Sequence, residues 1–245
     1  MKLLIDIGNT ATKFAYSTNN SFRFLNRIYN KDISEENINN IFKDIKIVES
    51  IYISSVAPKI KNQVSQILIK KYEVEPISLS TDLKDNVKIE IDNREELGID
   101  LYCDLVAAYQ EYGPKTVVID FGTATKILFI NDKGVFNSCA IFLGYEKSKN
   151  ILANSTELLP KVENKKIKPI SECRNTVDVI DSSAYYSQLF TVNGIIEEYE
   201  KEVGYTLKRV FTGGNAKDFI DTLGRDNYDE HLLFKGLLIL SERKE

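Results

Sequence analysis

The segment LLIDIGNTATK at residues 3–13 returns later in the chain, in closely related form, as VVIDFGTATKI at residues 117–127. In each copy an apolar run rich in β-branched residues ends in an aspartate, turns at a glycine, passes small hydroxyl residues and resumes as a second run. β-Branched residues favour strands, and glycine marks the turn between them. Each copy is therefore predicted to form a β-hairpin with an acidic residue at its bend.

The glycine and the aspartate of such a hairpin suit the binding of a nucleotide phosphate. Glycine lets the backbone point successive N–H groups outward, where they can hold a phosphate, and the aspartate can bind the divalent cation that accompanies it. A single Asp-x-Gly triplet is more often an ordinary turn. Two copies with the same flanking pattern favour nucleotide binding between two related halves of the chain.

The composition narrows the class of protein. A chain of 245 residues, 43% of them hydrophobic and 28% charged, can form one large or two ordinary globular domains. The net charge of −4 comes without a basic stripe, so no nucleic-acid partner is expected. The apolar runs are too short for a signal peptide or a membrane span. The unpaired spacing of Cys103, Cys139 and Cys173 and the single histidine indicate a reduced, cytoplasmic setting without a histidine-based metal site.

The first half is predicted to hold three strands and then alternating helices and strands. Alternation over residues 21–28 predicts the third strand, Ser34 would cap a helix, and Pro58 would open the next one. The other predicted elements are strands at 50–54 and 74–79, a polar segment at 82–96 and a helix from Asp100 that ends at Gly113-Pro114. That Gly-Pro pair is the predicted boundary between an N-terminal lobe, 1–113, and a C-terminal lobe, 114–245.

The second half is predicted to repeat this order. Its elements are strands at 116–120, 125–131, 134–141 and 207–212, helices at 145–156, from 176, from 194, at 215–223 and at 230–242, and an exposed connection at 161–170. Both halves thus read as βββαβα units, and the chain as a two-lobed α/β protein whose helices cover its sheets.

Four charged residues are candidates for chemistry. Asp100 and Asp104 lie four residues apart, hence on one side of a predicted helix. They fit either a helix cap with a solvated neighbour, or a base, Asp100, that accepts a proton from a substrate hydroxyl during phosphoryl transfer. Lys13 and Lys126 follow the two hairpin turns and could neutralise phosphate, although lysines at such positions are usually solvated.

A third glycine turn, at residues 212–215, joins a predicted strand to a predicted helix. Its Gly-Gly pair fits either an anion site at a helix N-terminus or a plain turn. The chain has neither the P-loop nor the dinucleotide-binding glycine pattern. His231 is expected to cap or pack.

The order and spacing of several motifs resemble those of type III pantothenate kinases. The motifs are Asp6-x-Gly8-Asn9-Thr10, Leu97-Gly98-Ile99-Asp100, Asp120-x-Gly122-Thr123-Ala124, Leu158-Leu159-Pro160, Asn175-Thr176 and Thr212-Gly213-Gly214. That family belongs to the acetate and sugar kinase/actin-like superfamily. The resemblance implies two ribonuclease-H-like lobes with an interlobe nucleotide cleft.

The resemblance also implies an activity, ATP-dependent phosphorylation of pantothenate to 4′-phosphopantothenate at the start of coenzyme A biosynthesis, by a homodimer. It implies that the phosphates of ATP and its Mg²⁺ are bound by Asp6, Ile7, Gly8, Asn9, Thr10, Ala11, Thr12 and Lys13. Thr123 would touch the nucleotide, and Asp120 would hold a monovalent cation, K⁺ or NH₄⁺. Pantothenate would contact Gly98, Ile99, Asp100, Leu101 and Thr176, with Asp100 as the catalytic base.

Three positions depart from the family pattern. The family has an arginine where this chain has Leu101, usually a tyrosine where it has Ile91, and a Gly-Gly-x-Ile-x-Pro-Gly motif where it has residues 138–144. Leucine cannot replace a planar cation. Two alternatives therefore stay open: a kinase of the same superfamily with another small hydroxyl acceptor, and a catalytically silent nucleotide-binding regulatory protein.

Overall fold

The computed structural model describes residues 1–18, 21–83, 87–163, 167–224 and 227–243. Parts of two predicted segments, residues 84–86 of the polar segment and 164–166 of the exposed connection, lie outside these ranges. The chain folds into two compact units, one formed by Met1–Gly113 with His231–Glu245 and the other by Pro114–Glu230. Among the described residues, no helix has both the length and the apolar composition that crossing a bilayer requires.

The first unit is built on a mixed sheet with the strand order β3-β2-β1-β4-β5. Strands β1 to β3 are antiparallel neighbours, whereas β4 runs parallel to β1 and β5 parallel to β4. The elements of this unit are β1 (Lys2–Ile7), β2 (Ala11–Thr18), β3 (Ser21–Tyr29), α1 (Glu35–Ile41), β4 (Ser50–Ser55), α2 (Pro58–Tyr72), β5 (Ile77–Ser78), β6 (Lys88–Ile89), α3 (Ile99–Tyr112) and α7 (Leu232–Arg243). The predicted first hairpin and third strand are confirmed, while β5 is shorter than predicted.

Local signals in the sequence begin and end these helices. The Ser34 hydroxyl accepts a hydrogen bond from the Asn37 N–H at 3.1 Å and caps α1, and Pro58 occupies the first turn of α2. Gly113, with φ of 74°, ends α3. The caps predicted at Ser34, Pro58 and Gly113 are therefore confirmed.

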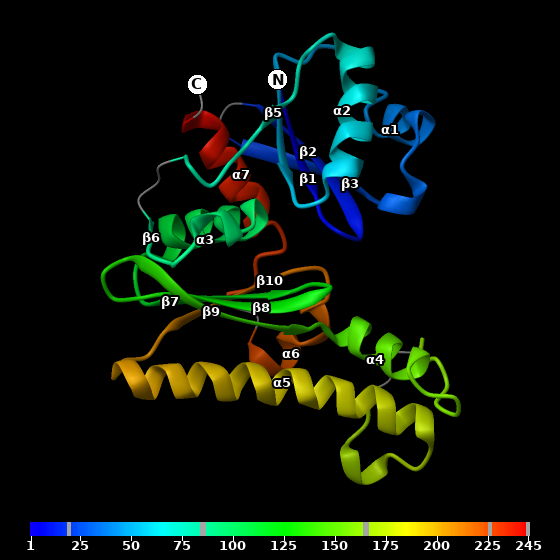
Figure 1. The fold of residues 1–245 in the computed structure, drawn as a ribbon, viewed down its shortest axis with the longest axis vertical. Coiled ribbons are helices and arrows are strands. Elements are labelled where there is room, and N and C mark those ends of the chain that lie inside the picture. Colours follow the sequence, from blue (N-terminus) through cyan, green and yellow to red (C-terminus); the bar gives the residue numbers. More distant parts are fainter. Residues whose placement is uncertain (19–20, 84–86, 164–166, 225–226, 244–245) are drawn as a thin grey trace. The chain divides into compact units, whose positions relative to one another are not determined.

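Apolar side chains on alternate strand positions cover both faces of the first sheet. Leu3 and Ile5 are fully buried together with Phe42 and Leu68, which come from the helical segments on that face. Leu4 is equally buried and points to the opposite face. There α3 and α7 pack against each other and against strands of this sheet (Figure 1).

The position of α7 corrects the predicted lobe boundary, since residues 231–245 belong to the first unit and not to the second. α7 contacts α3 and the strands β1, β3 and β4 of that unit, and Gly236 permits the close approach to α3. A Cβ atom at this position would lie 1.9 Å from the backbone oxygen of Cys103, so only glycine lets α7 approach α3 this closely. His231, before α7, packs on Phe24 with ring centroids 5.0 Å apart, in line with the packing role expected for it.

The second unit repeats the topology of the first. Its strands lie in the order β10-β7-β8-β9, with β7 to β9 antiparallel and β10 parallel to β7. The elements are β7 (Thr116–Phe121), β8 (Ala124–Ile130), β9 (Val135–Leu143), α4 (Tyr145–Asn154), α5 (Thr176–Val203), β10 (Lys208–Thr212) and α6 (Ile220–Leu223). The strands β9-β8-β7-β10 therefore pair as β3-β2-β1-β4 do in the first unit: three antiparallel strands followed by one parallel strand. The duplicated α/β architecture is confirmed.

Two predicted helices, from residues 176 and 194, are in fact the single helix α5. Its buried side runs unbroken past Gly194, from Leu189 and Val192 to Ile196. The cost of one glycine in a helix is only about 1 kcal/mol, and this apolar face offsets it. The helix predicted at 215–223 is instead a 3₁₀ turn (Ala216–Asp218) followed by α6.

Replacement of Gly194 by Ala is expected to raise the free energy of unfolding by about 0.5–1 kcal/mol. A Cβ atom at this position would meet no atom within 4 Å, so the gain in helix propensity comes without a clash. Urea unfolding followed by circular dichroism measures the change. A decrease would contradict a regular, open helix at this position.

Candidate functional site

The turn of the first hairpin is held by hydrogen bonds from Asn30, a residue that sequence analysis missed. The Asn30 side-chain amide donates to the Gly8 carbonyl at 2.8 Å and accepts from the Thr12 hydroxyl at 2.9 Å, and its main-chain N–H donates to the Thr10 carbonyl at 3.0 Å. Within the turn the Gly8 N–H donates to the Ala11 carbonyl. These bonds fix the backbone on which phosphate binding would depend.

Only part of the predicted phosphate segment is available to a ligand. Asn9 and Thr10 are exposed at the tip, whereas Ala11 and Thr12 are buried. Ile7 is fully buried in the core, and its carbonyl accepts a hydrogen bond from the Val56 N–H. The tip backbone and the side chains of Asn9 and Thr10 are therefore the groups best placed for contact with a phosphate.

Asp6 lies at the end of β1, next to this turn. It is 4% exposed, and its register partners are Lys13 on β2 and Ser54 on β4. The Lys13 ammonium is 3.4 Å from one carboxylate oxygen, and the Ser54 hydroxyl donates to the other at 3.4 Å. Both contacts are long for charge-assisted hydrogen bonds.

This carboxylate fits Mg²⁺ in the way common to kinases. Among the described residues, no three His, Cys, Asp or Glu side chains gather into a metal site of their own. Mg²⁺ is usually held by one or two carboxylates together with substrate phosphates, not by a cage of protein ligands. The Asp6 carboxylate, next to the turn predicted to bind phosphate, has the chemistry for such a site.

Gly98 and the first turn of α3 present Asp100. A Cβ atom on Gly98 would lie 2.4 Å from an Asp100 carboxylate oxygen, so the glycine leaves the space that this carboxylate occupies. Asp100 is half-buried, whereas its neighbours Ile99 and Leu101 are only 7% and 8% exposed. Of these three residues, Asp100 therefore has the most accessible side chain. The side chains of Ile99 and Leu101 are buried, so only their backbone atoms could contact a ligand.

Asp100 and Asp6 act on the same buried thiol. Burial raises the pKa of Cys103 well above its ordinary value, and the carboxylates of Asp104, Asp6 and Asp100 raise it further. Asp104 is 2% exposed, so it is not the solvated neighbour that sequence analysis allowed. The carboxylates of Asp104, Asp6 and Asp100 thus all lie near enough to the Cys103 thiol to raise its pKa.

The second hairpin carries Asp120 opposite Lys126. The two residues are register partners across β7 and β8, and the Lys126 ammonium lies 2.6 Å from a carboxylate oxygen of Asp120. Lys126 is therefore not a solvated lysine, contrary to expectation. The predicted role of Asp120 as ligand of K⁺ or NH₄⁺ does not fit this arrangement, because an ammonium group already neutralises the carboxylate.

Two other segments hold the turn that contains Thr123. The Gly144 N–H at the start of α4 donates to the Thr123 carbonyl at 3.1 Å. The Asn215 side-chain amide donates to the Gly122 carbonyl at 3.2 Å, and its main-chain N–H to the Phe121 carbonyl at 2.9 Å. The turn at residues 212–215 therefore supports the hairpin, and these bonds explain why Asn215 does not begin a regular helix.

A buried charged cluster, also missed from the sequence, anchors α4 to α5. The Lys149 ammonium lies 2.9 Å from the Asp181 carboxylate, and both side chains are almost fully buried. The Tyr145 hydroxyl donates to the same carboxylate, and burial followed by this bond raises the pKa of Tyr145. Seven residues further along α5, Gln188 bonds both Thr125 and the Leu143 carbonyl. These long-range contacts leave no motif in the sequence.

Thr176 is the last of the predicted substrate contacts. Asn175 caps α5 by accepting a hydrogen bond from the Asp178 N–H at 2.9 Å, as its position predicted. Thr176 is the first residue of the helix and is exposed. Its side chain is therefore accessible in the second unit.

Comparison with known proteins points to one family. The sequence profile described as "Type III pantothenate kinase" matches residues 2–198. A type III pantothenate kinase of Sulfurihydrogenibium sp. is 31% identical over 99% of this chain and 100% of its own length. That of Syntrophobacter fumaroxidans is 34% identical over 81% of this chain and 77% of its own.

Solved structures agree on the fold. A Campylobacter jejuni protein assigned to the Baf family of transcriptional activators superposes with a TM-score of 0.60 at 20% identity, over 99% of this chain and 98% of its own. A Sinorhizobium meliloti protein assigned as a 2-dehydro-3-deoxygalactonokinase gives 0.59 at 10% identity, over 99% and 98%. At these identities the likeness concerns the fold alone.

Proposed function

This chain belongs to the type III pantothenate kinase family, and we propose that its first unit carries both the phosphate site and the catalytic base of an ATP-dependent pantothenate kinase. The reaction yields 4′-phosphopantothenate for coenzyme A biosynthesis. The observation that carries the assignment of residues is the placement of two carboxylates: Asp6 lies at the end of β1 beside the turn that Asn30 holds, and Asp100 occupies the space that Gly98 leaves at the first turn of α3. One serves the nucleotide and the other the acceptor.

Asp100 is the base in this proposal. Its half-buried carboxylate accepts the proton of the pantothenate hydroxyl as the hydroxyl oxygen attacks the γ-phosphorus of ATP. The backbone of Gly98, Ile99 and Leu101 positions the acceptor around this carboxylate, and Thr176 is a further acceptor contact in this proposal. A general base of this kind contributes about 10²–10⁴-fold to the rate.

The phosphate turn and Thr123 bind the nucleotide. The turn from Gly8 to Thr10 and the Lys13 ammonium contact the phosphates, and Thr123 on the second hairpin touches ATP. Mg²⁺ bound at Asp6 would supply charge neutralisation on the phosphate oxygens. This assignment is supported by the turn that Asn30 holds and by the position of Asp6 at the end of β1, next to that turn.

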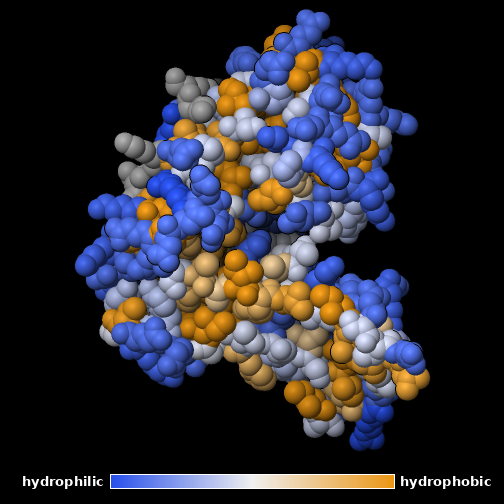
Figure 2. All heavy atoms as spheres, viewed as in Figure 1, coloured by the Kyte–Doolittle hydropathy of each residue, from blue (hydrophilic) through white to orange (hydrophobic). Residues whose placement is uncertain are grey.

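We also propose that the protein forms a homodimer and acts in the cytoplasm. Large apolar side chains stay exposed on β9 and α5 of the second unit, among them Ile141 at 60% and Phe190 at 62%. Figure 2 shows hydrophobic residues, in orange, at the surface of this face of the molecule. Such groups are typical of a surface that a partner covers. The three cysteines are free, as expected for a reducing compartment.

The activity is tested by ADP release from Mg-ATP. Release that depends on pantothenate supports the proposal. Because Leu101 is buried and offers no cation to an acceptor carboxylate, a panel of other small hydroxyl compounds should be assayed alongside. Release with one of these compounds and not with pantothenate would identify a kinase of different specificity. Nucleotide binding without turnover on any acceptor would identify a regulatory protein.

Asp6→Asn is expected to raise the Mg²⁺ concentration required for half-maximal activity by about tenfold or more, because the amide removes the charge that holds the metal. The measurement is the Mg²⁺ dependence of ADP release at saturating pantothenate. Asp44→Asn, in the segment after α1 and exposed, is the control and should leave this dependence unchanged. An unaltered Mg²⁺ requirement in Asp6→Asn would exclude Asp6 as the metal contact.

A further inference from the structure

The ammonium group of Lys126 occupies a defined position at the base of the second hairpin. It lies 2.6 Å from a carboxylate oxygen of Asp120, and the two side chains are only 20% and 14% exposed. They sit directly opposite each other on neighbouring antiparallel strands, which places both on one face of the sheet. A charge-assisted bond this short and partly shielded from water is among the stronger polar contacts in proteins.

Two glycines leave the space that the Asp120 carboxylate occupies. A Cβ atom on Gly213 would lie 2.3 Å from one carboxylate oxygen, and one on Gly122 would lie 3.6 and 3.7 Å from the two oxygens. Gly213 has φ of 97°, a conformation that favours glycine. The carboxylate therefore fills the space between two glycine turns, and the ammonium bound to it is fixed next to the turn that carries Thr123.

The equivalent pair in the first hairpin is looser. Lys13 and Asp6 occupy the same positions of the repeated segment, yet their charged atoms are 3.4 Å apart. Asp6 also accepts a bond from Ser54. The two hairpins thus differ in what their aspartates hold. Asp120 pairs at 2.6 Å with a cation that belongs to the chain, whereas the corresponding contact of Asp6 is longer.

A second cation on Asp120 would lie beside the Lys126 ammonium with one carboxylate between them, and the two positive charges would repel each other. We propose that Lys126 supplies the monovalent cation of this kinase from within the chain, so that nucleotide binding and phosphoryl transfer require neither K⁺ nor NH₄⁺. The inference rests on the proposed function, in which Thr123 beside this pair contacts ATP.

The first experiment measures ADP release with K⁺ and NH₄⁺ replaced by tetramethylammonium. The wild-type rate is expected to change less than about twofold when KCl is restored, because the tethered ammonium is always present. Lys126→Ala should lose about tenfold or more in this buffer and regain most of it with KCl or NH₄Cl. Lys126→Gln, which keeps the length and a donor but not the charge, should behave in the same way.

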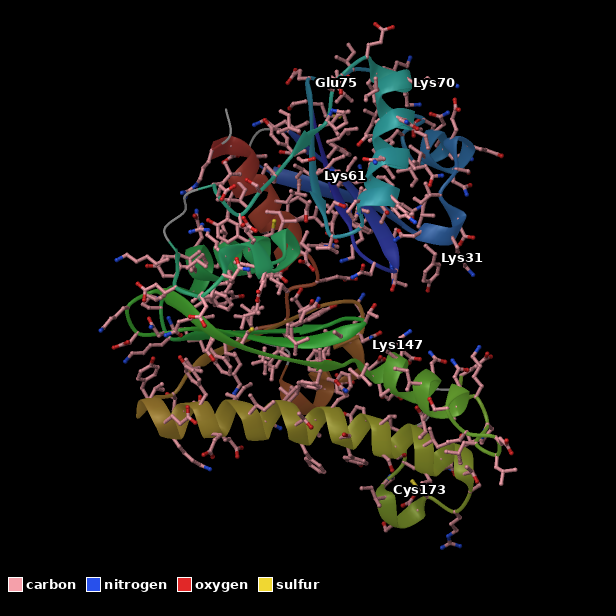
Figure 3. The ribbon with its side chains drawn as sticks, viewed as in Figure 1. Lys31, Lys61, Lys70, Glu75, Lys147 and Cys173 are labelled. Carbon is pink, nitrogen blue, oxygen red and sulfur yellow. The ribbon has the colours of Figure 1, made fainter. Side chains whose placement is uncertain are left out.

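The control is Lys147→Ala, at an exposed lysine on α4 of the same unit (Figure 3). It should match the wild type in both buffers. Thermal unfolding of each variant, with and without KCl, shows whether the protein folds and whether K⁺ binds. KCl should raise the melting temperature of Lys126→Ala more than that of the wild type or Lys147→Ala.

A second readout does not depend on turnover. Calorimetric titration with a non-hydrolysable ATP analogue should give the same affinity for the wild type in KCl and in tetramethylammonium chloride, and a K⁺-dependent affinity for Lys126→Ala. This pattern supports the inference even if pantothenate is not the acceptor, in which case the proposed substrate alone fails. A wild-type rate or affinity that rises tenfold with K⁺ overturns the inference. A fully active Lys126→Ala without K⁺ dependence overturns it equally.

Discussion

Asp100→Asn is expected to lower the rate of pantothenate phosphorylation by about 10²–10⁴-fold, while ATP affinity stays within about twofold. Asparagine has nearly the shape of aspartate, so the space beside Gly98 remains filled and the first turn of α3 keeps its geometry. The amide cannot accept the proton of the attacking hydroxyl. The loss therefore falls on kcat and much less on nucleotide binding.

Steady-state ADP release and calorimetric titration with an ATP analogue measure the two quantities separately. Asp92→Asn, an exposed change in the segment that leads to α3, is the matched control and should keep full activity. A rate within a factor of ten of the wild type in Asp100→Asn would exclude it as the base, whatever the acceptor is.

Gly236→Ala is expected to lower the free energy of unfolding by about 3 kcal/mol or more. The added methyl group would meet main-chain atoms of Cys103, with the nearest distances at 1.9, 2.5 and 2.7 Å. Backbone cannot rotate away as a flexible side chain can, so α7 must move from α3. Gly194→Ala adds the same methyl group to a helix with open space and serves as the matched control.

Cys103 reports the separation of α7 from α3 in the folded protein. In the wild type the thiol is buried, and burial together with the nearby carboxylates raises its pKa, so little reactive thiolate forms at pH 8. Exposure in Gly236→Ala would return the pKa toward its ordinary value and speed alkylation. Mass spectrometry of the Cys103 peptide after brief treatment with iodoacetamide measures this rate. Wild-type stability and an equally slow Cys103 reaction would show that α7 does not depend on close approach at Gly236.

Features with a local physical cause could be predicted from the sequence. The two hairpins follow from apolar runs that end at Asp-x-Gly, and the helix starts at Ser34 and Pro58 follow from a capping hydroxyl and a ring with fixed φ. Asp100 could be singled out because a glycine two residues earlier and a following helix give it a recognisable setting. The family resemblance then supplied its role.

Features that depend on distant contacts could not be predicted. Gly194 looks like a helix end, and only the core under α5 shows that the helix continues. Asn30 lies 22 residues from the carbonyl it bonds, so no spacing connects it to the phosphate turn. Lys126 was expected to be solvated, because strand alternation predicts which face of the sheet a side chain lies on but not which side chain lies next to it there. Its pairing with Asp120 emerges from the register of β7 and β8.

Lys149, on α4, also lies outside any motif, although it is one of the largest fully buried side chains. Lysine is almost never buried without a partner. Its partner, Asp181, comes from another helix, and sequence periodicity cannot pair two residues across that distance. Buried polar residues of this kind are found only from the packed structure.

The first unit is assembled from the two ends of the described chain, with α7 lying against α3 after the whole second unit has intervened. Ribosomes deliver the chain from its N-terminus, and domains generally fold as they emerge. All strands of the second unit therefore leave the ribosome before the helix that covers the Cys103 backbone. During synthesis the Cys103 main chain of the first unit therefore stays uncovered until α7 has emerged.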